Sequence, residues 1–435
     1  MPRTQPIRAA RGVRDLLPDA LSTWREVLHA ARRQAERYGY QEIEVPVIEQ
    51  EALVERGVGG DTDVVRKEIY RIQPMAEGGG TPLVLRPEAT AGMVRAYFEG
   101  NLNQGPQPVR LWTAGAMFRH DRPQAGRYRQ FQQYDVEVIG DPGAAFDAEV
   151  VELTWDWYRE LGVEGLTLEL NSIGDPRCRP GYLERLRAYF RPYRDRLGPD
   201  DQRRLETNPL RLLDSKEPEL TGLKEEAPRI TDALCEECAA HWAEVQALLD
   251  AAGIRYRLNP YLVRGLDYYT RTVWEYQHEA LGGAQNSLGG GGRYDGLAEA
   301  LGYPPTPAVG FAGGLDRIVM VLDAQRGGAR PQAAAALLLL PDGEGLDGAT
   351  AAVARCARTA TSVAADYSRR SLRAKMRGAS RSGARWVAIM NTDEASRRVV
   401  QLRELDSGEQ REVGWEDLPR ALTSMDPPGD QHERI

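Results

Sequence analysis

The chain has 435 residues, 42% hydrophobic and 28% charged, with a formal net charge of -8 at pH 7. This length suits two or three globular domains with ample apolar core. No apolar run approaches the ~20 residues needed to span a bilayer, and the basic N-terminus lacks the apolar stretch of a secretory signal. We therefore expect a cytoplasmic protein with no membrane partner. The acidic balance excludes a protein that coats nucleic acid through its global charge.

The first part of the chain predicts a mainly antiparallel sheet flanked by helices. An apolar stripe at helical spacing begins after Pro18 and ends near Gly39, which indicates a helix. Residues 42–45 alternate as a strand and stop at Pro46. Further strand-like stretches lie at 83–85, 109–113, 129–139, 166–170 and 272–276. This spacing favours an α+β core.

Composition divides the chain into domains. Residues 1–325 form the predicted core, which a charged helical insertion interrupts at 175–259. A linker is predicted at 326–332, where Gly327, Gly328 and Pro331 occur. Residues 333–424 predict a small α/β domain with a buried strand at 333–340, a helix at 349–360 and a strand at 386–390. The polar tail at 425–435 is expected to be mobile.

The acidic excess lies entirely in the first three quarters of the chain, because residues 332–435 carry as many basic as acidic residues. Within this neutral part, seven basic residues follow one another without an intervening carboxylate. They are Arg369, Arg370, Arg373, Lys375, Arg377, Arg381 and Arg385. This pattern fits either a face that contacts phosphate or an ordinary solvated helix.

A basic turn at residues 118–131 joins two predicted strands. It carries Arg119, Arg122, Arg127 and Arg129 around Gly126. Guanidinium groups bind phosphate oxygens in a bidentate way, so the turn predicts an anion site; a solvated hairpin is the alternative.

The strand after this turn has a polar face. Its two-residue period places Phe131, Gln133, Asp135 and Glu137 on one side. Carboxylates suit a ligand with ammonium or imidazole N–H groups, and an aromatic ring can stack on a purine. The same polarity would also fit the solvated side of an antiparallel sheet.

Three further segments have both functional and structural interpretations. Residues 262–276 suit a ligand loop or tyrosines packed in a core. The glycine run at 288–296 suits a flexible linker or a backbone that a ligand approaches closely. Residues 309–322 predict a strand that turns into a helix with Arg317 in its first turn, where it could face phosphate or solvent.

The chain has four cysteines, too few for a disulfide framework and in keeping with a reducing compartment. Cys235 and Cys238 have metal-ligand spacing, but no second pair stands at finger spacing and His241 alone would not complete a tetrahedral site. We therefore predict no metal bound by protein thiols.

Taken together, these segments resemble the histidyl-tRNA synthetase family of class II aminoacyl-tRNA synthetases. Residues 11–18 resemble the family's opening motif, 40–49 its motif 1, 118–137 its motif 2 and 310–317 its motif 3. Residues 264–269 and 290–295 resemble its two histidine-specific signatures. The similarity runs in order from about residue 8 to 422. It implies a class II core and a C-terminal domain of the anticodon-binding kind.

The resemblance assigns roles to individual residues. It implies that Arg264 and Arg119 are catalytic. It implies a histidine site made of Glu88, Ala89, Thr90, Gln133, Glu137, Tyr268 and Tyr269. The implied ATP site consists of Arg119, Arg127, Phe131 and Arg317.

The resemblance also implies the reaction. Histidine and ATP would form histidyl-adenylate and pyrophosphate, with Mg²⁺ on the pyrophosphate, and histidine would then pass to the 3′ end of its tRNA. The C-terminal domain would grip the anticodon arm, with Arg373, Lys375 and Arg377 as candidate tRNA contacts. Motif 1 would form a homodimer interface.

Two departures and one rival qualify these expectations. Asp135 stands where bacterial relatives commonly carry glycine, and Ile389-Met390-Asn391 replaces the more usual Ile-Gly pattern in the C-terminal domain. The rival is a catalytically silent paralogue that serves as a regulatory subunit of ATP phosphoribosyltransferase. Such paralogues generally lack the Arg264 motif and the C-terminal domain, and this chain has both.

Overall fold

The computed structural model describes residues 7–60, 62, 64–73, 80–215, 217, 220–281, 286–328 and 335–424. The chain forms two compact units, Met1–Ala329 (unit 1) and Arg330–Ile435 (unit 2). The predicted tail at 425–435, and most of the predicted linker at 326–332, lie outside the described residues. Within the described ranges, no helix is both long enough and apolar enough to cross a bilayer.

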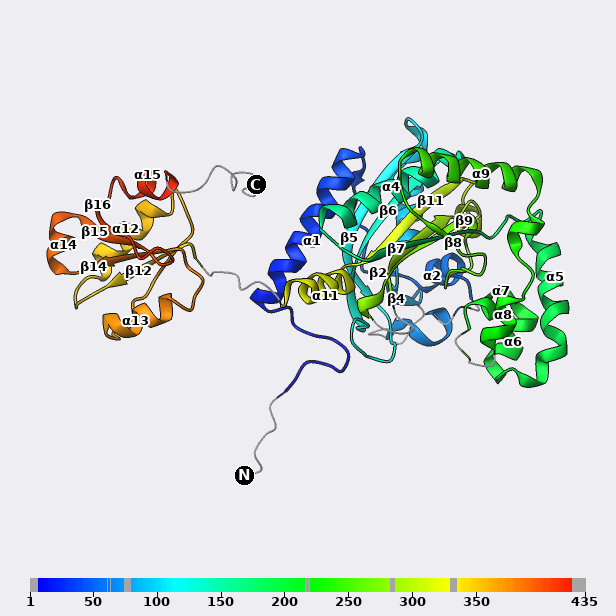
Figure 1. Cartoon of the computed structure of the whole chain (residues 1–435), viewed down its shortest axis with the longest axis horizontal. Coiled ribbons are helices and arrows are strands. Elements are labelled where there is room, and N and C mark those ends of the chain that lie inside the picture. The colour runs from blue at the N-terminus through cyan, green and yellow to red at the C-terminus, as the bar shows by residue number, and fades with distance from the viewer. Residues whose placement is uncertain are drawn as a thin grey trace, which may run out of the picture. The chain divides into compact units, whose positions relative to one another are not determined.

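Unit 1 is built on an eight-stranded sheet in the order β1-β5-β6-β11-β10-β9-β7-β8 (Figure 1). The pairs β1–β5 and β7–β8 at the two edges are parallel, and all other pairs are antiparallel. The mainly antiparallel core predicted from the sequence is therefore confirmed. The strands are β1 (Gln41–Glu42), β5 (Val109–Phe118), β6 (Gln130–Ile139), β7 (Leu166–Ser172), β8 (Arg257–Leu258), β9 (Thr270–His278), β10 (Ser287–Arg293) and β11 (Ala308–Gly314).

One face of this sheet packs against four helices. These are α1 (Pro18–Arg37), α4 (Ala144–Glu160), α9 (Glu236–Ala251) and α11 (Leu315–Arg326). Helix α1 begins with Pro18 in its first turn, where the missing N–H costs no hydrogen bond. Tyr134, Val136 and Val138 of β6 point into the same apolar core as these helices. Because side chains alternate along a strand, the residues between them point to the opposite face.

The opposite face carries smaller elements and a second apolar cluster. Helices α2 (Glu51–Val58), α3 (Thr90–Glu99) and α10 (Leu297–Ala300) lie here, as does a three-stranded antiparallel sheet of β2 (Ile48–Gln50), β4 (Leu83–Leu85) and β3 (Tyr70–Ile72). The strand predicted over 42–45 is only partly correct, because β1 ends at Glu42. Val45 instead packs in the cluster on this face, and Pro46 cannot donate to a strand ladder.

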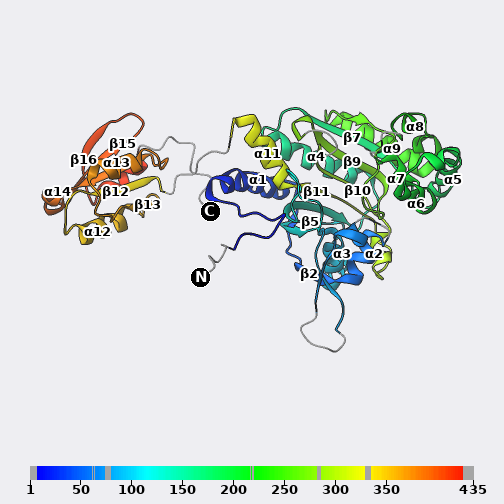
Figure 2. The same cartoon turned by 90° about the horizontal axis from the view of Figure 1, so that it is seen from below.

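The helical insertion has an apolar core of its own. Tyr182, Leu186, Phe190 and Leu212 are buried together there, and the helices gather at one edge of unit 1 in both views (Figures 1 and 2). These helices are α5 (Arg179–Phe190), α6 (Pro199–Thr207), α7 (Leu210–Leu213) and α8 (Thr221–Glu225). Helix α9, which also falls within the predicted 175–259, packs differently. Its buried Trp242, together with Val245 and Leu249, belongs to the core of the main sheet.

Unit 2 is an α/β domain, as the sequence predicts. Its five-stranded sheet has the order β13-β12-β14-β15-β16, with parallel pairs on both sides of β12. The strands are β12 (Leu337–Pro341), β13 (Val363–Ala365), β14 (Trp386–Met390), β15 (Val399–Glu404) and β16 (Gln410–Gly414). The helices are α12 (Asp347–Ala357), α13 (Leu372–Ala379), α14 (Thr392–Arg397) and α15 (Leu418–Thr423).

Candidate active site

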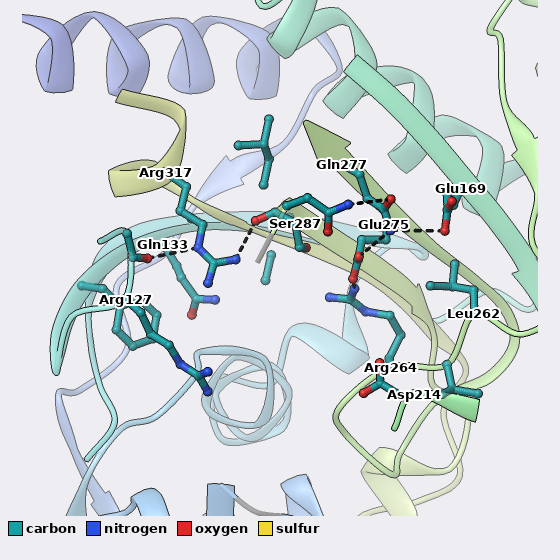
Figure 3. A pocket seen from close by; sticks show the side chains of 18 of the residues that line it. Arg127, Gln133, Glu169, Asp214, Leu262, Arg264, Glu275, Gln277, Ser287 and Arg317 are labelled. Carbon is teal, nitrogen blue, oxygen red and sulfur yellow. Dashed lines mark hydrogen bonds and ion pairs between the residues drawn. The ribbon is translucent and has the colours of Figure 1, made fainter. Parts of the chain in front are cut away.

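A cavity of about 690 Å³ opens on the face of the main sheet opposite the four helices. Strands β6, β10 and β11, the β5–β6 hairpin and the segment before β9 all contribute to its lining. Figure 3 shows Arg127 and Arg317 on one side of this cavity and Arg264 on the other. Six of the residues that the sequence proposes as site residues line it: Arg119, Arg127, Phe131, Gln133, Arg264 and Arg317.

Arg317 is held in place by two backbone carbonyls. It lies in the first turn of α11, and its guanidinium donates to the carbonyls of Gly126 (3.1 Å) and Ser287 (2.6 Å). Burial lowers the pKa of Arg317, and the guanidinium of Arg127 lowers it further, with smaller contributions from Arg119 and Arg264. Four guanidinium groups therefore act on one space, a field that favours a polyanionic ligand.

The hairpin arginines are held at the cavity by local contacts. Arg119 donates from Nε to the carbonyl of Pro87 (2.9 Å), and its guanidinium lies 5.4 Å from the centre of the Phe131 ring. Arg127 pairs with Asp121 of the same turn. The structure thus places the basic turn against the cavity rather than in solvent alone, and an aromatic face lies beside its charges.

A cluster of buried carboxyl groups lies next to this arginine-lined space. Glu137 is only 1% exposed, and it accepts a hydrogen bond from Thr90 Oγ1 (2.8 Å). Glu88 accepts from the backbone N–H groups of Thr90 (2.9 Å) and Ala91 (3.1 Å), at the start of α3. Ala89, which stands between Glu88 and Thr90 in the chain, is fully buried. The loop before α3 and strand β6 therefore bring these acidic groups together.

Asp135 adds a third carboxyl group to the cluster. It is fully buried, and neither of its oxygens has a hydrogen-bond partner within the described residues. Burial raises the pKa of Asp135, and the nearby carboxylate of Glu88 raises it further. Burial likewise raises the pKa of Glu88 and of Glu137. Such a cluster is stabilised by a ligand that brings positive charge and N–H donors.

Tyrosines enclose this carboxyl cluster. The Tyr268 and Tyr269 rings lie 4.6 Å apart, and Tyr268 also packs edge-on against Tyr294. Tyr294 donates its hydroxyl to Glu137. Sequence reasoning did not select Tyr294, although it stands within the quoted 290–295 signature.

The glycine run is a strand rather than a linker. Residues Ser287–Arg293 form β10, and Gly289 through Gly292 are buried. A Cβ at Gly292 would lie 2.7 Å from the Tyr269 ring, and one at Gly290 would lie 2.6 Å from Arg264 Cζ. Glycine is therefore required where the Tyr269 ring and the Arg264 guanidinium rest on the strand backbone.

Arg264 has a partner that the sequence reasoning missed. Its Nη1 pairs with the carboxylate of Glu275 on β9, and both side chains are less than one-fifth exposed. The Nε of Arg264 has no partner among the described residues. Glu275 stands in the alternating strand that follows the tyrosine pair, and no sequence signal distinguished it from a solvated strand residue.

In unit 2, the proposed tRNA contacts do not share one surface. Arg373 and Arg377 are exposed and lie four residues apart on α13, so they occupy the same face. Lys375 is buried, with 4% exposure, and donates to the Pro341 carbonyl (2.7 Å). The expectation that Lys375 contacts tRNA is therefore corrected. Lys375 lies two positions from both arginines along the helix, so its side chain points to a different side, and its ammonium group binds a carbonyl inside the unit.

Comparison with known proteins supports one family along most of the chain. A model described as histidyl-tRNA synthetase matches residues 12–174 and 200–318, and an anticodon-binding-domain model matches residues 339–425. The histidine–tRNA ligase of Desulfitobacterium hafniense is 42% identical over 417 residues, which cover 96% of this chain and 97% of that protein. That of Moorella thermoacetica is 44% identical over 404 residues, covering 93% and 95%.

A solved structure gives the same answer for the fold. The apo histidyl-tRNA synthetase of S. aureus superimposes with a TM-score of 0.79 at 32% identity, covering 96% of this chain and 100% of that one. The class II core and the C-terminal α/β domain predicted from the sequence are thereby confirmed. The chain belongs to the histidyl-tRNA synthetase family, the ATP-dependent class II ligases that join histidine to its tRNA.

Proposed function

We propose that the cavity of unit 1 performs the histidine–tRNA ligase reaction, with ATP in its arginine-lined part and histidine against the carboxyl cluster. One observation carries this proposal. An arginine-rich space and a buried acidic pocket adjoin, and Arg119 belongs to both, because it lines the cavity and its charge also acts on Glu88 and Asp135. This arrangement brings a polyanion and a cation into contact.

Histidine is the cation in this proposal. Its ammonium and ring N–H groups would donate to Glu88, Glu137 and the Gln133 side-chain oxygen. That oxygen is buried and lacks a partner among the described residues. Thr90 orients Glu137, Ala89 shapes the floor, and Tyr268 with Tyr269 closes the pocket. An amino acid that lacks the N–H groups of histidine would leave these buried acceptors unpaired, so the site would reject it.

ATP would bind across the arginine-lined part. Arg119 would hold the α-phosphate, Arg127 and Arg317 the outer phosphates, and Phe131 would stack on the adenine. The cation–π contact between Arg119 and Phe131 supports this arrangement, because it keeps the proposed phosphate and adenine contacts close to each other.

Mg²⁺ is proposed to accompany ATP. Among the carboxylates that line the cavity, Asp121, Glu275 and Asp316 each pair with an arginine, and within the described residues no three His, Cys, Asp or Glu side chains converge there as metal ligands. The ion therefore fits on phosphate oxygens and water rather than in a dedicated protein cage, as Mg²⁺ commonly binds. When bound, it would neutralise charge on the pyrophosphate.

Arg264 is proposed to stabilise the transition state of the first step. A histidine carboxylate oxygen attacks the α-phosphorus in line, and the bond from that phosphorus to the pyrophosphate oxygen breaks. Negative charge grows on the non-bridging oxygens during this step. A guanidinium fixed by Glu275 and by the backbone of Gly290 is preorganised to meet that charge.

The second step transfers histidine to the terminal ribose hydroxyl of tRNA, which attacks the adenylate carbonyl and releases AMP. Unit 2 would hold the anticodon arm through the exposed face of α13 that carries Arg373 and Arg377. Tyr367 lies just before this helix and is 50% exposed, so its ring is available to stack on a base. This reaction belongs to translation, which supports a cytoplasmic location.

A homodimer through residues 40–49 completes the proposal. Val47 and Ile48 in this segment are 38% and 51% exposed, and Leu83 on the neighbouring β4 is 39% exposed. Large apolar side chains in such a group are typical of a covered surface. The substitution Ile48→Glu should shift the sedimentation coefficient from that of a dimer toward that of a monomer.

The function is tested by aminoacylation. Purified protein, ATP, Mg²⁺, labelled histidine and bacterial tRNA should yield acid-precipitable label that is lost on mild alkaline treatment, because the product is an ester. A regulatory paralogue would bind histidine without producing labelled tRNA. That outcome would overturn the proposed ligase activity.

A further inference from the structure

Three cysteines and one aspartate converge at the junction between the main sheet and the helical insertion. Asp175 and Cys178 lie between β7 and α5, whereas Cys235 and Cys238 lie at the start of α9. The ligand atoms of all four side chains lie within 4.8 Å of one another. Spacing along the chain does not reveal this set, because 57 positions separate its two halves.

We propose that Asp175, Cys178, Cys235 and Cys238 form a structural site for a single divalent zinc ion. Zinc binds thiolates at ~2.3 Å and carboxylate oxygens at ~2.1 Å, so a tetrahedral site places sulfur and oxygen about 3.6 Å apart. Asp175 Oδ1 lies 3.7 Å from Cys178 Sγ and 4.0 Å from Cys235 Sγ. An iron–sulfur cluster would spread its thiolates over several iron atoms and needs wider separations.

The residues around the cluster hold the proposed ligands in place. Arg177 donates from Nε (3.2 Å) and Nη2 (2.8 Å) to Asp175 Oδ2, while Oδ1 accepts from the Arg177 backbone N–H (3.0 Å) and lies near the thiols of Cys178 and Cys235. An oriented carboxylate of this kind is typical of ligands held by an outer shell. Gly174 has φ +64°, and a Cβ there would lie 2.7 Å from Cys178 Sγ. The backbone can therefore pass the sulfur only at a glycine.

Charge also fits. Three thiolates and a carboxylate around Zn²⁺ leave a net charge of about -2. Arg177 pairs with Asp175, and Arg271 lies 3.6 Å from the same carboxylate. Cys235 is the N-cap residue of α9, and this end of a helix favours a nearby group of negative charge.

This proposal departs from the expectation that no protein thiol binds a metal. That expectation considered His241 as the one nearby partner, and the structure places His241 against Asp147 instead (3.1 Å). The site would join the two ends of the helical insertion. It would also fix Arg179, which follows Cys178 and donates to the carbonyls of Gly174 (2.8 Å) and Tyr269 (2.7 Å).

Metal content of the full-length protein tests the site. Protein purified without chelators from cells grown with zinc should contain about one zinc ion per chain, as measured by inductively coupled plasma mass spectrometry. Cys178→Ser and Cys235→Ser should each lower the zinc affinity by at least about 100-fold, more than an outer-shell change does. The matched control is Cys356→Ser, which removes the remaining cysteine, in unit 2, and should leave zinc binding unchanged.

A second measurement uses only the wild-type protein, so it tests the site even if the cysteine variants fail to fold. Folded wild-type protein, stripped of metal and titrated with Co²⁺, should develop a thiolate-to-cobalt charge-transfer band that saturates at one equivalent and disappears on addition of Zn²⁺. Three outcomes would overturn the proposal: no metal bound by the folded wild-type protein, equal binding by Cys178→Ser, or a disulfide between these cysteines in the freshly purified protein.

Discussion

The guanidinium of Arg264 pairs with the carboxylate of Glu275 at the edge of the cavity, and the backbone of Gly290 lies directly against it. Strands β9 and β10, together with the segment before β9 that carries Arg264, thus fix the orientation of this positive charge. A charge held in this way needs little reorganisation when a phosphoryl group develops negative charge.

Removal of the Arg264 charge should affect catalysis more than binding. Arg264→Ala is expected to lower the rate of ATP–pyrophosphate exchange by about 10²–10³-fold, because it removes a contact that strengthens in the transition state. Histidine binding, measured by calorimetry, should change only modestly. Arg257→Ala is a suitable control, since this exposed arginine pairs with Glu169 beside the same cavity. Equal losses in binding and exchange would contradict the catalytic role.

Asp135 should make the protein less stable as the pH rises. Its pKa is raised in the folded state by burial and by Glu88, so the folded chain holds this proton more tightly than the unfolded chain does. The stability linked to Asp135 is therefore complete below the unfolded pKa of about 3.9 and is lost as the pH rises through the folded pKa.

Asp135→Asn removes this titration and keeps the size of the side chain. In calorimetry without ligands, the variant should unfold at a higher temperature than the wild-type protein at pH 8, and the difference should shrink toward pH 4. The hydrogen bond with Arg203 lowers the pKa of the exposed Asp200, so Asp200→Asn should change the pH dependence slightly and in the opposite direction. If the two proteins keep the same pH profile, Asp135 does not carry the linkage.

A buried ionic triad should contribute to the stability of unit 1 on the helix side. Asp147 is fully buried, accepts from Arg293 Nε (2.9 Å) and contacts His241. Burial alone would raise the pKa of Asp147, but the charge of Arg293 and the hydrogen bond with His241 outweigh it and lower the pKa. Its contribution to stability is thus present above the unfolded pKa and lost as the pH falls through the folded pKa.

Asp147→Asn would remove the buried counter-charge of Arg293 and leave this guanidinium paired with the partly exposed carboxylate of Asp295. We expect a loss of about 3–5 kcal/mol in the free energy of unfolding at pH 7, measured by urea denaturation. Asp393→Asn breaks an exposed pair with Arg397 and should cost less than about 1 kcal/mol. Similar small losses for both variants would show that the buried triad is dispensable.

The exposed face of α13 should contribute to tRNA binding. Arg373→Ala combined with Arg377→Ala should raise the KM for tRNA and reduce its dependence on salt, because two phosphate contacts are lost. ATP–pyrophosphate exchange should stay unchanged. Arg397→Ala combined with Arg398→Ala removes the same charge from arginines that pair with carboxylates in unit 2. An unchanged KM in the first double variant would make the α13 face a merely solvated surface.

Local patterns in the sequence predict much of this architecture. The alternation over Phe131, Gln133, Asp135 and Glu137 predicts a polar sheet face, and the structure places these side chains opposite the apolar core. The strand-to-helix turn before Arg317 is also read correctly, because its signals are local in the chain.

Features created by tertiary contacts escape such reasoning. The approach of Cys178 to Cys235 depends on how the insertion returns to the sheet. The pairing of Arg264 with Glu275 depends on a loop folding back over its own strand. Lys375 stands in a basic run, and only the packing of α13 on β12 shows that it is buried against Pro341. Composition alone does not separate a buried lysine from an exposed one.

The most direct test of the central claim is ATP–pyrophosphate exchange on the purified protein with Mg²⁺ and each of the twenty amino acids in turn. The geometry of the cavity and the acidic pocket predicts exchange with histidine alone. Exchange with a different amino acid, or none with any amino acid from folded protein, would contradict the assignment of this site to histidine activation.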